Sequence, residues 1–216
     1  MPIEYPFSEE PNSRRPTEVR APHRSLLLDV LHSRRSIAPK HLVEPPPSPS
    51  ELRLIIETGL AAPDHGNLRR WRMVAIPWPM RATLAAVFEA AKLEETPAAS
   101  AEDRQKSRAK AWNAPLLLAV LFEPDGNHPV VPVDEQLLAL GAALQNMLLA
   151  AHALGYGAMI TSGRKIRTEA LQSAFVRSPS EELMAFVSFG TPARTSRPRE
   201  AALIERHVSI WDGMST

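Results

Sequence analysis

The chain has 216 residues, of which 44% are hydrophobic and 23% are charged, and its formal net charge is +1. These values are typical of one globular domain with a substantial core, and the small net charge gives no general attraction to nucleic acids or membranes. The sequence contains no cysteine, which excludes disulfides, thiolate metal ligands and a cysteine nucleophile.

The ends of the sequence differ in composition from its middle. Prolines recur through residues 1–22, and we expect a flexible N-terminal arm there, followed by a single domain over 23–216 that ends in a C-terminal arm. No charge-free apolar run reaches the length of about 18 residues that a membrane span needs, and no signal peptide is visible. With the missing cysteines, this favours a cytoplasmic location.

Apolar spacing predicts the elements in chain order. A helix over 24–35 ends in Arg34-Arg35-Ser36, and Ser48-Pro49-Ser50-Glu51 has the form of a capping box before a second helix that Pro63 ends. The pattern then predicts a strand over 72–76, helices over 80–93 and 98–112, a strand over 115–122, a helix over 135–154 with Asp134 as its cap, a strand over 156–161, a short helix or loop over 166–176, and a strand over 183–189.

The segment 135–154 is apolar nearly all round, which is typical of a central helix or of one buried between subunits. Gly155 can end it in a left-handed conformation. Helices and short strands alternate irregularly, without a run of tight hairpins. This order favours an α+β three-layer α/β/α sandwich with a mainly antiparallel central sheet.

Two short stretches allow both a structural and a functional interpretation. Arg34 and Arg35 can complement the dipole at a helix C-terminus, or their guanidinium groups can hold a phosphate or the polar edge of a ring. Gly66-Asn67 can be an ordinary turn, or it can let the backbone approach a ligand, beside which His65 can donate a hydrogen bond. The residues alone favour the structural interpretation.

Three motifs together resemble the FMN-dependent nitroreductase family, in particular its small bacterial branch. They are Arg34-Arg35-Ser36, the stretch Ala62-Pro63-Asp64-His65 followed by Trp71, and the glycine-containing segment 155–163. The resemblance covers roughly residues 26–192, and the Ala-Pro-Asp-His stretch is its most specific part. It implies the nitroreductase-like sandwich and a homodimer with FMN at the subunit interface.

The resemblance also implies a set of cofactor-binding positions and two departures from the family pattern. The implied FMN-binding residues are Arg34, Arg35, Ser36, Ala61, His65, Ile160, Thr161, Ser162, Arg197 and Arg199. Relatives tend to carry an arginine where this chain has Ala61, and a Trp-Arg-Ser-like segment at 160–162. Arg69, Arg70 and Arg164 are candidate replacements for the missing charge.

The chemistry is expected to come from a cofactor rather than from side chains. No nucleophile elbow is present, the seven histidines show no metal-ligand spacing, and the glycines do not form a dinucleotide fingerprint. The resemblance implies that FMN accepts a hydride from NADH or NADPH and passes it to a small acceptor such as a nitroaromatic or a quinone, with no catalytic side chain. The alternative is a non-catalytic flavin- or ligand-binding protein. We expect no nucleic-acid or membrane partner.

Overall fold

The computed structural model describes residues 21–194, 202–211 and 213, and the side chains from residue 26 onward. The chain divides into two compact units, Met1–Ser33 and Arg34–Thr216. The first unit contains helix α1 (Ala21–Ser33), which confirms the predicted helix but ends before Arg34. Residues 1–20 of the expected arm lie outside the described part of the chain.

The second unit is built on one antiparallel sheet. Its strands are β1 (Leu42–Val43), β2 (Trp71–Ala75), β3 (Leu116–Phe122), β4 (Gly157–Thr161) and β5 (Glu182–Pro192). The order is β1-β5-β3-β2, and β4 also pairs with β5. Every pairing between these strands is antiparallel, as predicted. The sequence analysis missed β1, because two residues are too short to show a periodic pattern.

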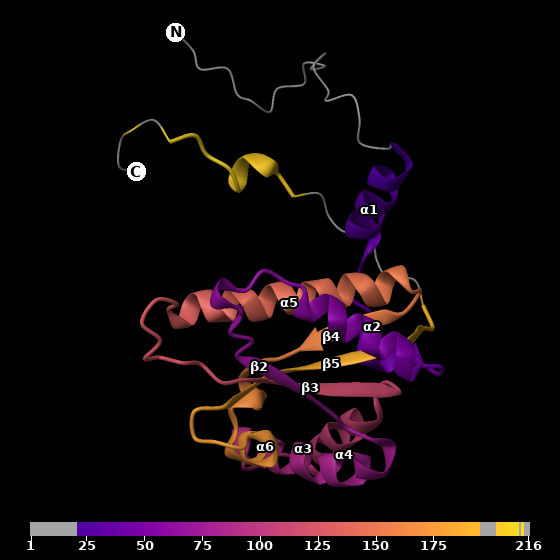
Figure 1. Cartoon of the computed structure of the whole chain (residues 1–216). Helices are drawn as coiled ribbons and strands as arrows, with labels where there is room; N and C mark the ends of the chain where they lie inside the picture. Colours follow the sequence, from indigo (N-terminus) through magenta and orange to yellow (C-terminus); the bar gives the residue numbers. More distant parts are fainter. Residues whose placement is uncertain (1–20, 195–201, 212, 214–216) are drawn as a thin grey trace. The chain divides into compact units, whose positions relative to one another are not determined.

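Helices cover both faces of this sheet (Figure 1) and confirm the predicted three layers. On one face lie α2 (Pro49–Leu60) and α5 (Val133–Ala153), and on the other lie α3 (Arg81–Glu95), α4 (Ala101–Ala109) and α6 (Glu169–Phe175). Short 3-10 turns join them, including η1 (Pro39–His41), η2 (His65–Asn67), η4 (Lys110–Trp112) and η5 (Arg164–Arg167). Within the described residues, no helix is long and apolar enough to cross a membrane.

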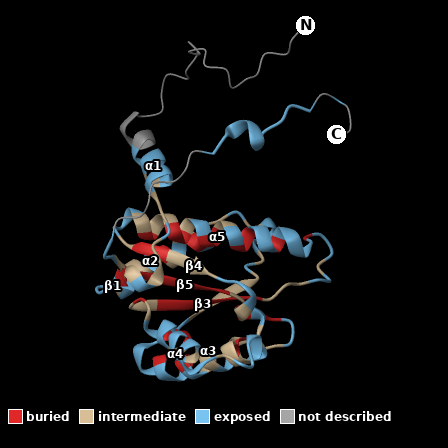
Figure 2. Cartoon of the chain, turned by 180° about the vertical axis from the view of Figure 1, so that it is seen from behind, coloured by how far each residue is buried: buried red, intermediate tan, exposed pale blue. Residues whose placement is uncertain are grey.

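The alternation of side chains along the strands produces two separate cores, one on each face (Figure 2). From β3, Leu118 and Val120 join the α2/α5 core, whereas Leu117 and Leu121 join the α3/α6 core. The register of β3 and β5 shifts between Val120 and Leu121, so β5 has one extra residue at Met184. Leu183 and Ala185 therefore face opposite layers although they are two residues apart.

The helix ends follow the sequence signals in two places and differ in a third. Ser48 forms the predicted capping box with Glu51: the Ser48 amide donates to the Glu51 carboxylate at 2.8 Å, and the Glu51 amide donates to Ser48 Oγ at 3.3 Å. Gly155 follows α5 with φ of +88°, as predicted. The predicted cap at Asp134 is wrong, because α5 already begins at Val133 and Pro132 precedes it. Proline's fixed φ suits it to this position.

A partly buried ion pair fixes the start of β5 to β2. Arg72 donates to both carboxylate oxygens of Glu181, at 2.6 and 2.7 Å, and to the Phe175 carbonyl at 2.9 Å. The Arg177 amide adds a third bond to the same carboxylate at 2.8 Å. These bonds, led by those from Arg72, hold the pKa of Glu181 below its usual value.

We predict that Glu181→Gln lowers the free energy of unfolding at pH 7 by about 2 kcal/mol, because Arg72 loses its buried counter-charge. A lowered carboxyl pKa stabilises the fold above the unfolded-state pKa, and this contribution is lost as pH falls through the folded-state pKa. The deficit of the variant should therefore shrink in acid. Urea denaturation at pH 7 and pH 3.5 measures both effects.

The neighbouring Glu182→Gln is the matched control, because the Glu182 side chain is 48% exposed and pairs with an exposed arginine. Its expected loss is below about 1 kcal/mol. Equal losses in the two variants would contradict the role assigned to Glu181.

Candidate functional site

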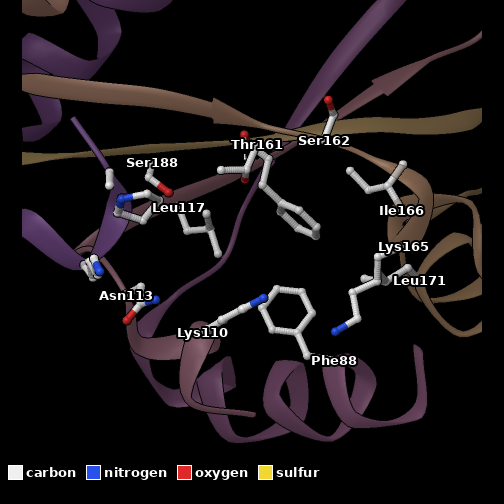
Figure 3. Close-up of a pocket in the computed structure, with 14 residues that line it drawn as sticks. Phe88, Lys110, Asn113, Leu117, Thr161, Ser162, Lys165, Ile166, Leu171 and Ser188 are labelled. Atoms are coloured by element: carbon white, nitrogen blue, oxygen red, sulfur yellow. Dashed lines mark hydrogen bonds between the residues drawn. The ribbon is translucent and has the colours of Figure 1, made fainter. Parts of the chain in front are cut away.

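One cavity, called the apolar cavity below, lies between the sheet and the α3/α4/α6 layer (Figure 3). Its volume is about 410 Å³, within the range typical of small-molecule sites. Segments far apart in the sequence build it: the η1 region, α3, η4, β3, β4, η5, α6 and β5. The lining residues are Ala38, Pro39, Lys40, Phe88, Lys110, Asn113, Leu117, Thr161, Ser162, Lys165, Ile166, Leu171, Phe186 and Ser188.

Aromatic and aliphatic side chains make most of the wall. Phe186 packs edge-on against Phe88, with ring centroids 5.6 Å apart, and against Phe175 at 5.5 Å. Such edge-to-face contacts favour a defined ring orientation. The cavity therefore has a rigid apolar surface suited to a flat ring system.

Two lysines enter this apolar cavity. Figure 3 shows Lys110 and Lys165 directed into it on either side of Phe88. Lys165 is half-buried and donates to Ser107 Oγ, and this hydroxyl donates in turn to the Phe88 carbonyl at 2.8 Å. Burial, together with the charge of Lys110, lowers the pKa of Lys165. The sequence analysis missed both lysines, because nothing in a charged helical segment or a 3-10 turn indicates a shared cavity.

The predicted FMN-binding segments 34–36 and 160–162 meet β4 at different places. Ser36 forms a parallel bridge with Ala158, and the Ile37 amide donates to the Ala158 carbonyl at 3.1 Å. At the other end of β4, Thr161 and Ser162 line the apolar cavity. The Ile160 side chain packs against the α2/α5 core instead, on the opposite face of the sheet.

Arg34 and Arg35 lie near the C-terminal end of α5. Their positive charges, after the larger effect of burial, lower the pKa of His152 in the last turn of that helix. Ala61 directly follows α2, whose Gly59 packs against Ala143 and Met147 in the middle of α5. His65 lies near the other end, since His65 Nδ1 is 2.7 Å from Glu135 Oε2 in the first turn of α5. From residue 135 to residue 152 the helix rises about 25 Å. One chain therefore does not bring His65 together with Arg34 and Arg35.

Two of the remaining predicted FMN-binding residues, Arg197 and Arg199, lie outside the described residues. Of the suggested replacements, Arg70 is used by the fold, since its Nε donates to the Glu123 carbonyl at 2.7 Å. Arg69 has φ of +47° beside Asp64, which accepts from its amide at 2.7 Å. Arg164 stands next to Lys165 and lines a second cavity rather than the apolar one.

Comparison with known proteins identifies the family of this chain. The sequence model of the nitroreductase family matches residues 31–191. "Putative NAD(P)H nitroreductase YdjA" of Escherichia coli K12 is 32% identical over 167 residues, covering 76% of this chain and 87% of that protein. A "Putative NAD(P)H nitroreductase" of Haemophilus influenzae is 30% identical over 178 residues, covering 82% and 94%. The chain belongs to the nitroreductase family of oxidoreductases.

Solved structures confirm the nitroreductase-like fold. A nitroreductase-like protein from Bacillus cereus superposes with a TM-score of 0.73 at 17% identity, over 87% of this chain and 96% of that one. A Desulfovibrio desulfuricans protein, described as a "putative nitroreductase in complex with fmn", superposes with a TM-score of 0.63 at 26% identity, over 83% and 94%. Among the described residues of this chain, no group of three or more His, Asp or Glu side chains could hold a metal ion.

A buried arginine supports the wall of the apolar cavity. Arg81 is fully buried and donates to the Ala111 carbonyl at 2.7 Å and to the Pro115 carbonyl at 3.3 Å. Between these two acceptors, Ala114 has φ of +88°, a conformation that is costly for a residue with a side chain. Lys110 and Asn113, which line the cavity, belong to the same stretch. Arg81 thus holds a strained segment in place.

We predict that Arg81→Met lowers the free energy of unfolding by about 2 to 3 kcal/mol, because two buried carbonyls lose a charged donor. Thermal unfolding followed by circular dichroism measures this loss. Arg53→Met is the control, since Arg53 is highly exposed and its helical ion pair with Glu57 contributes at most about 0.5 kcal/mol. A stable Arg81→Met variant would show that the segment keeps its conformation without the guanidinium group.

Proposed function

We propose that this chain is an FMN-dependent oxidoreductase that passes a hydride from NADH or NADPH to a small acceptor such as a nitroaromatic or a quinone. The observation that carries the proposal is the apolar cavity beside β4, with aromatic walls and two lysines. The names of the E. coli and H. influenzae relatives and the FMN complex of the D. desulfuricans relative support it.

The residues present fit FMN. The rings of Phe88 and Phe186 both line the apolar cavity, perpendicular to each other, and the isoalloxazine ring would stack on one of them. Lys110 and Lys165 supply positive charge beside that surface, which is how proteins tune a flavin ring. Arg34 and Arg35 supply guanidinium groups suited to a phosphate. When bound, FMN supplies the hydride transfer, which none of these side chains can perform.

This chain's own residues would bind the flavin ring, orient it and shield it from water. The closed side of the apolar cavity, formed by Leu117, Ile166 and Leu171, keeps water from one face of a bound ring. The Ser107 bond holds Lys165 in position. Burial lowers the pKa of Lys165, and a negative charge that approaches its ammonium would oppose this shift.

A homodimer explains why the predicted residues lie at opposite ends of α5. The outward face of α5 and α2 exposes large apolar side chains, among them Leu138 at 73%, Leu137 at 43% and Leu54 at 48%. A two-fold axis crossing α5 would place its first turn beside the last turn of the second copy. The partner subunit's His65 would then approach Arg34 and Arg35. The cysteine-free composition suits a reducing, cytoplasmic setting for such a dimer.

Steady-state kinetics test the reaction itself. With NADH or NADPH as donor and a nitroaromatic or quinone as acceptor, both substrates should use the same cavity in turn. Double-reciprocal plots at several acceptor concentrations should therefore give parallel lines. A protein that holds FMN but oxidises neither dinucleotide would be a flavin carrier, and the enzymatic proposal would fail.

Arg35→Ala should weaken FMN binding by about 10- to 100-fold, because a charge-assisted contact to the phosphate is lost. Fluorescence titration of the apoprotein with FMN measures the dissociation constant. Arg35→Lys should recover part of the affinity, since it keeps the charge but not the two-pronged geometry. The exposed Arg53→Ala should bind FMN like the unsubstituted protein; if Arg35→Ala does so too, Arg35 has no part in FMN binding.

Leu138→Glu should convert the dimer to a monomer and release FMN, because a charge at a buried interface is costly and each site needs both chains. Sedimentation velocity and the flavin absorbance of the separated species report the two effects. Ala86→Glu, on the exposed side of α3, is the control and should stay dimeric. A monomeric Leu138→Glu that retains FMN would place the whole site within one chain.

A further inference from the structure

A second cavity adjoins the apolar cavity, and we propose that it binds the anionic group of a ligand whose flat body occupies the apolar cavity. We call it the basic cavity; it is lined by Lys92, Glu95, Asp103, Lys106, Ser107, Lys110, Ser162, Gly163, Arg164 and Lys165. The anion is a carboxylate or a phosphate, carried by the acceptor or by the nicotinamide donor. The inference rests on the proposed function for the identity of these two ligands.

The two cavities adjoin each other, since Lys110, Ser162 and Lys165 line both of them. The basic cavity has a volume of about 470 Å³, ample for a carboxylate or phosphate with its hydrating water. A ligand can therefore place its apolar part in the apolar cavity, against a flavin ring held there, and extend a charged substituent between α3, α4 and η5.

The charges around the basic cavity do not balance. Five cationic side chains line it, namely Lys92, Lys106, Lys110, Arg164 and Lys165, against only two carboxylates, Glu95 and Asp103. The formal net charge of the whole chain is only +1, so this excess is local. A concave surface lined by charges of one sign attracts ligands of the opposite sign.

Carboxylates on the neighbouring helices do not compensate the excess. Glu89 binds Arg104 and Arg108, at 3.4 and 2.7 Å, and Glu94 accepts from the amides of residues 169 and 170, each at 2.8 Å. Asp103 already accepts from Ser100 Oγ at 2.9 Å.

The cations themselves have few partners. Lys106 pairs with Glu102 at 2.6 Å, but both side chains are largely exposed, so this ion pair is weak. The Lys92 ammonium donates only to Thr96 Oγ1, at 3.1 Å. In the part of the chain that the structure describes, the side chains of Lys110 and Arg164 form neither an ion pair nor a hydrogen bond.

Lys165 lines both cavities, and the excess positive charge affects its pKa. It is half-buried, and a hydroxyl rather than a carboxylate is its partner. Burial and the charges of Lys110 and Lys92 lower its pKa, while Glu95 opposes them. A bound anion would reverse this repulsion, because an opposite charge nearby favours the protonated amine.

Two acceptors of equal shape test the proposal: 4-nitrobenzoate, which is charged, and 4-nitrobenzamide, which is neutral. The measured quantity is the ratio of their kcat/KM values with the FMN-loaded protein. We expect the carboxylate to be preferred, and the preference to decline as sodium chloride is raised. Lys106→Gln and Arg164→Gln should each lower the ratio about threefold, and the double variant about tenfold if the two effects are independent.

The second part of the test measures how tightly the nicotinamide donor binds. Rapid mixing with NADH or NADPH under anaerobic conditions gives the dissociation constant of each donor for the same variants. If the phosphates of the donor occupy the basic cavity, donor binding weakens about tenfold in the double variant and the acceptor ratio stays constant. If the acceptor occupies it, only the ratio changes. Either result supports an anion site, and the difference identifies the ligand.

Arg167→Gln is the matched control, because Arg167 lies on the same η5 turn as Arg164 but pairs with Glu182 and does not line the basic cavity. It should keep the acceptor ratio of the unsubstituted protein. Unchanged acceptor ratios and unchanged donor binding in the double variant would overturn the proposal. So would a loss of FMN affinity alone, which would assign the basic cavity to the FMN phosphate.

A binding measurement separates this inference from the proposed function. Calorimetric titration of the FMN-loaded protein with 4-nitrobenzoate and 4-nitrobenzamide requires no turnover. Selective binding of the carboxylate, reduced in the double variant, would support the anion site even if neither dinucleotide were oxidised. Turnover without any such selectivity, together with unchanged donor binding in the double variant, would leave the enzyme in place and refute the anion site.

Discussion

Pairing along β5 is the constraint on which the rest of the structure depends. This strand (Glu182–Pro192) pairs with β1, β3 and β4, and its two faces contribute to both cores. Phe186 and Ser188 reach the apolar cavity from it, while Arg72 fixes the chain at its beginning through Glu181. The bulge at Met184 decides which side chains face the cavity layer. Changes in β5 would therefore affect stability and the site together.

The site combines a rigid apolar wall with an excess of cations. The rings of Phe88 and Phe186 are fixed by packing, and Arg81 holds the strained η4–β3 connection from which Lys110 projects. Lys165 is half-buried, so water screens its charge less than the charges of the exposed Lys110 and Arg164, and it acts more strongly on a ligand. The same arrangement that suits a flavin ring thus also favours anionic groups on the ligands that approach it.

Local sequence signals predicted the fold well. The capping box at Ser48 and the left-handed Gly155 depend on nearby residues only, and both are confirmed. The apolar periodicity gave α5 and the sheet strands except β1. The cavity was not predictable in this way, because Phe88, Lys110 and Lys165 come from three separate elements that only the tertiary fold brings together. The family resemblance supplied Thr161 and Ser162, which do line the cavity, whereas the Ile160 side chain faces the other core.

The visible absorption spectrum of the purified protein under anaerobic conditions, before and after addition of NADH or NADPH, tests the central claim most directly. We expect flavin bands in the protein as isolated or after reconstitution with FMN, and their bleaching by at least one of the two dinucleotides. A protein that takes up no FMN, or whose flavin bands persist with both donors, would contradict the account. The apolar cavity would then have to serve a different ligand.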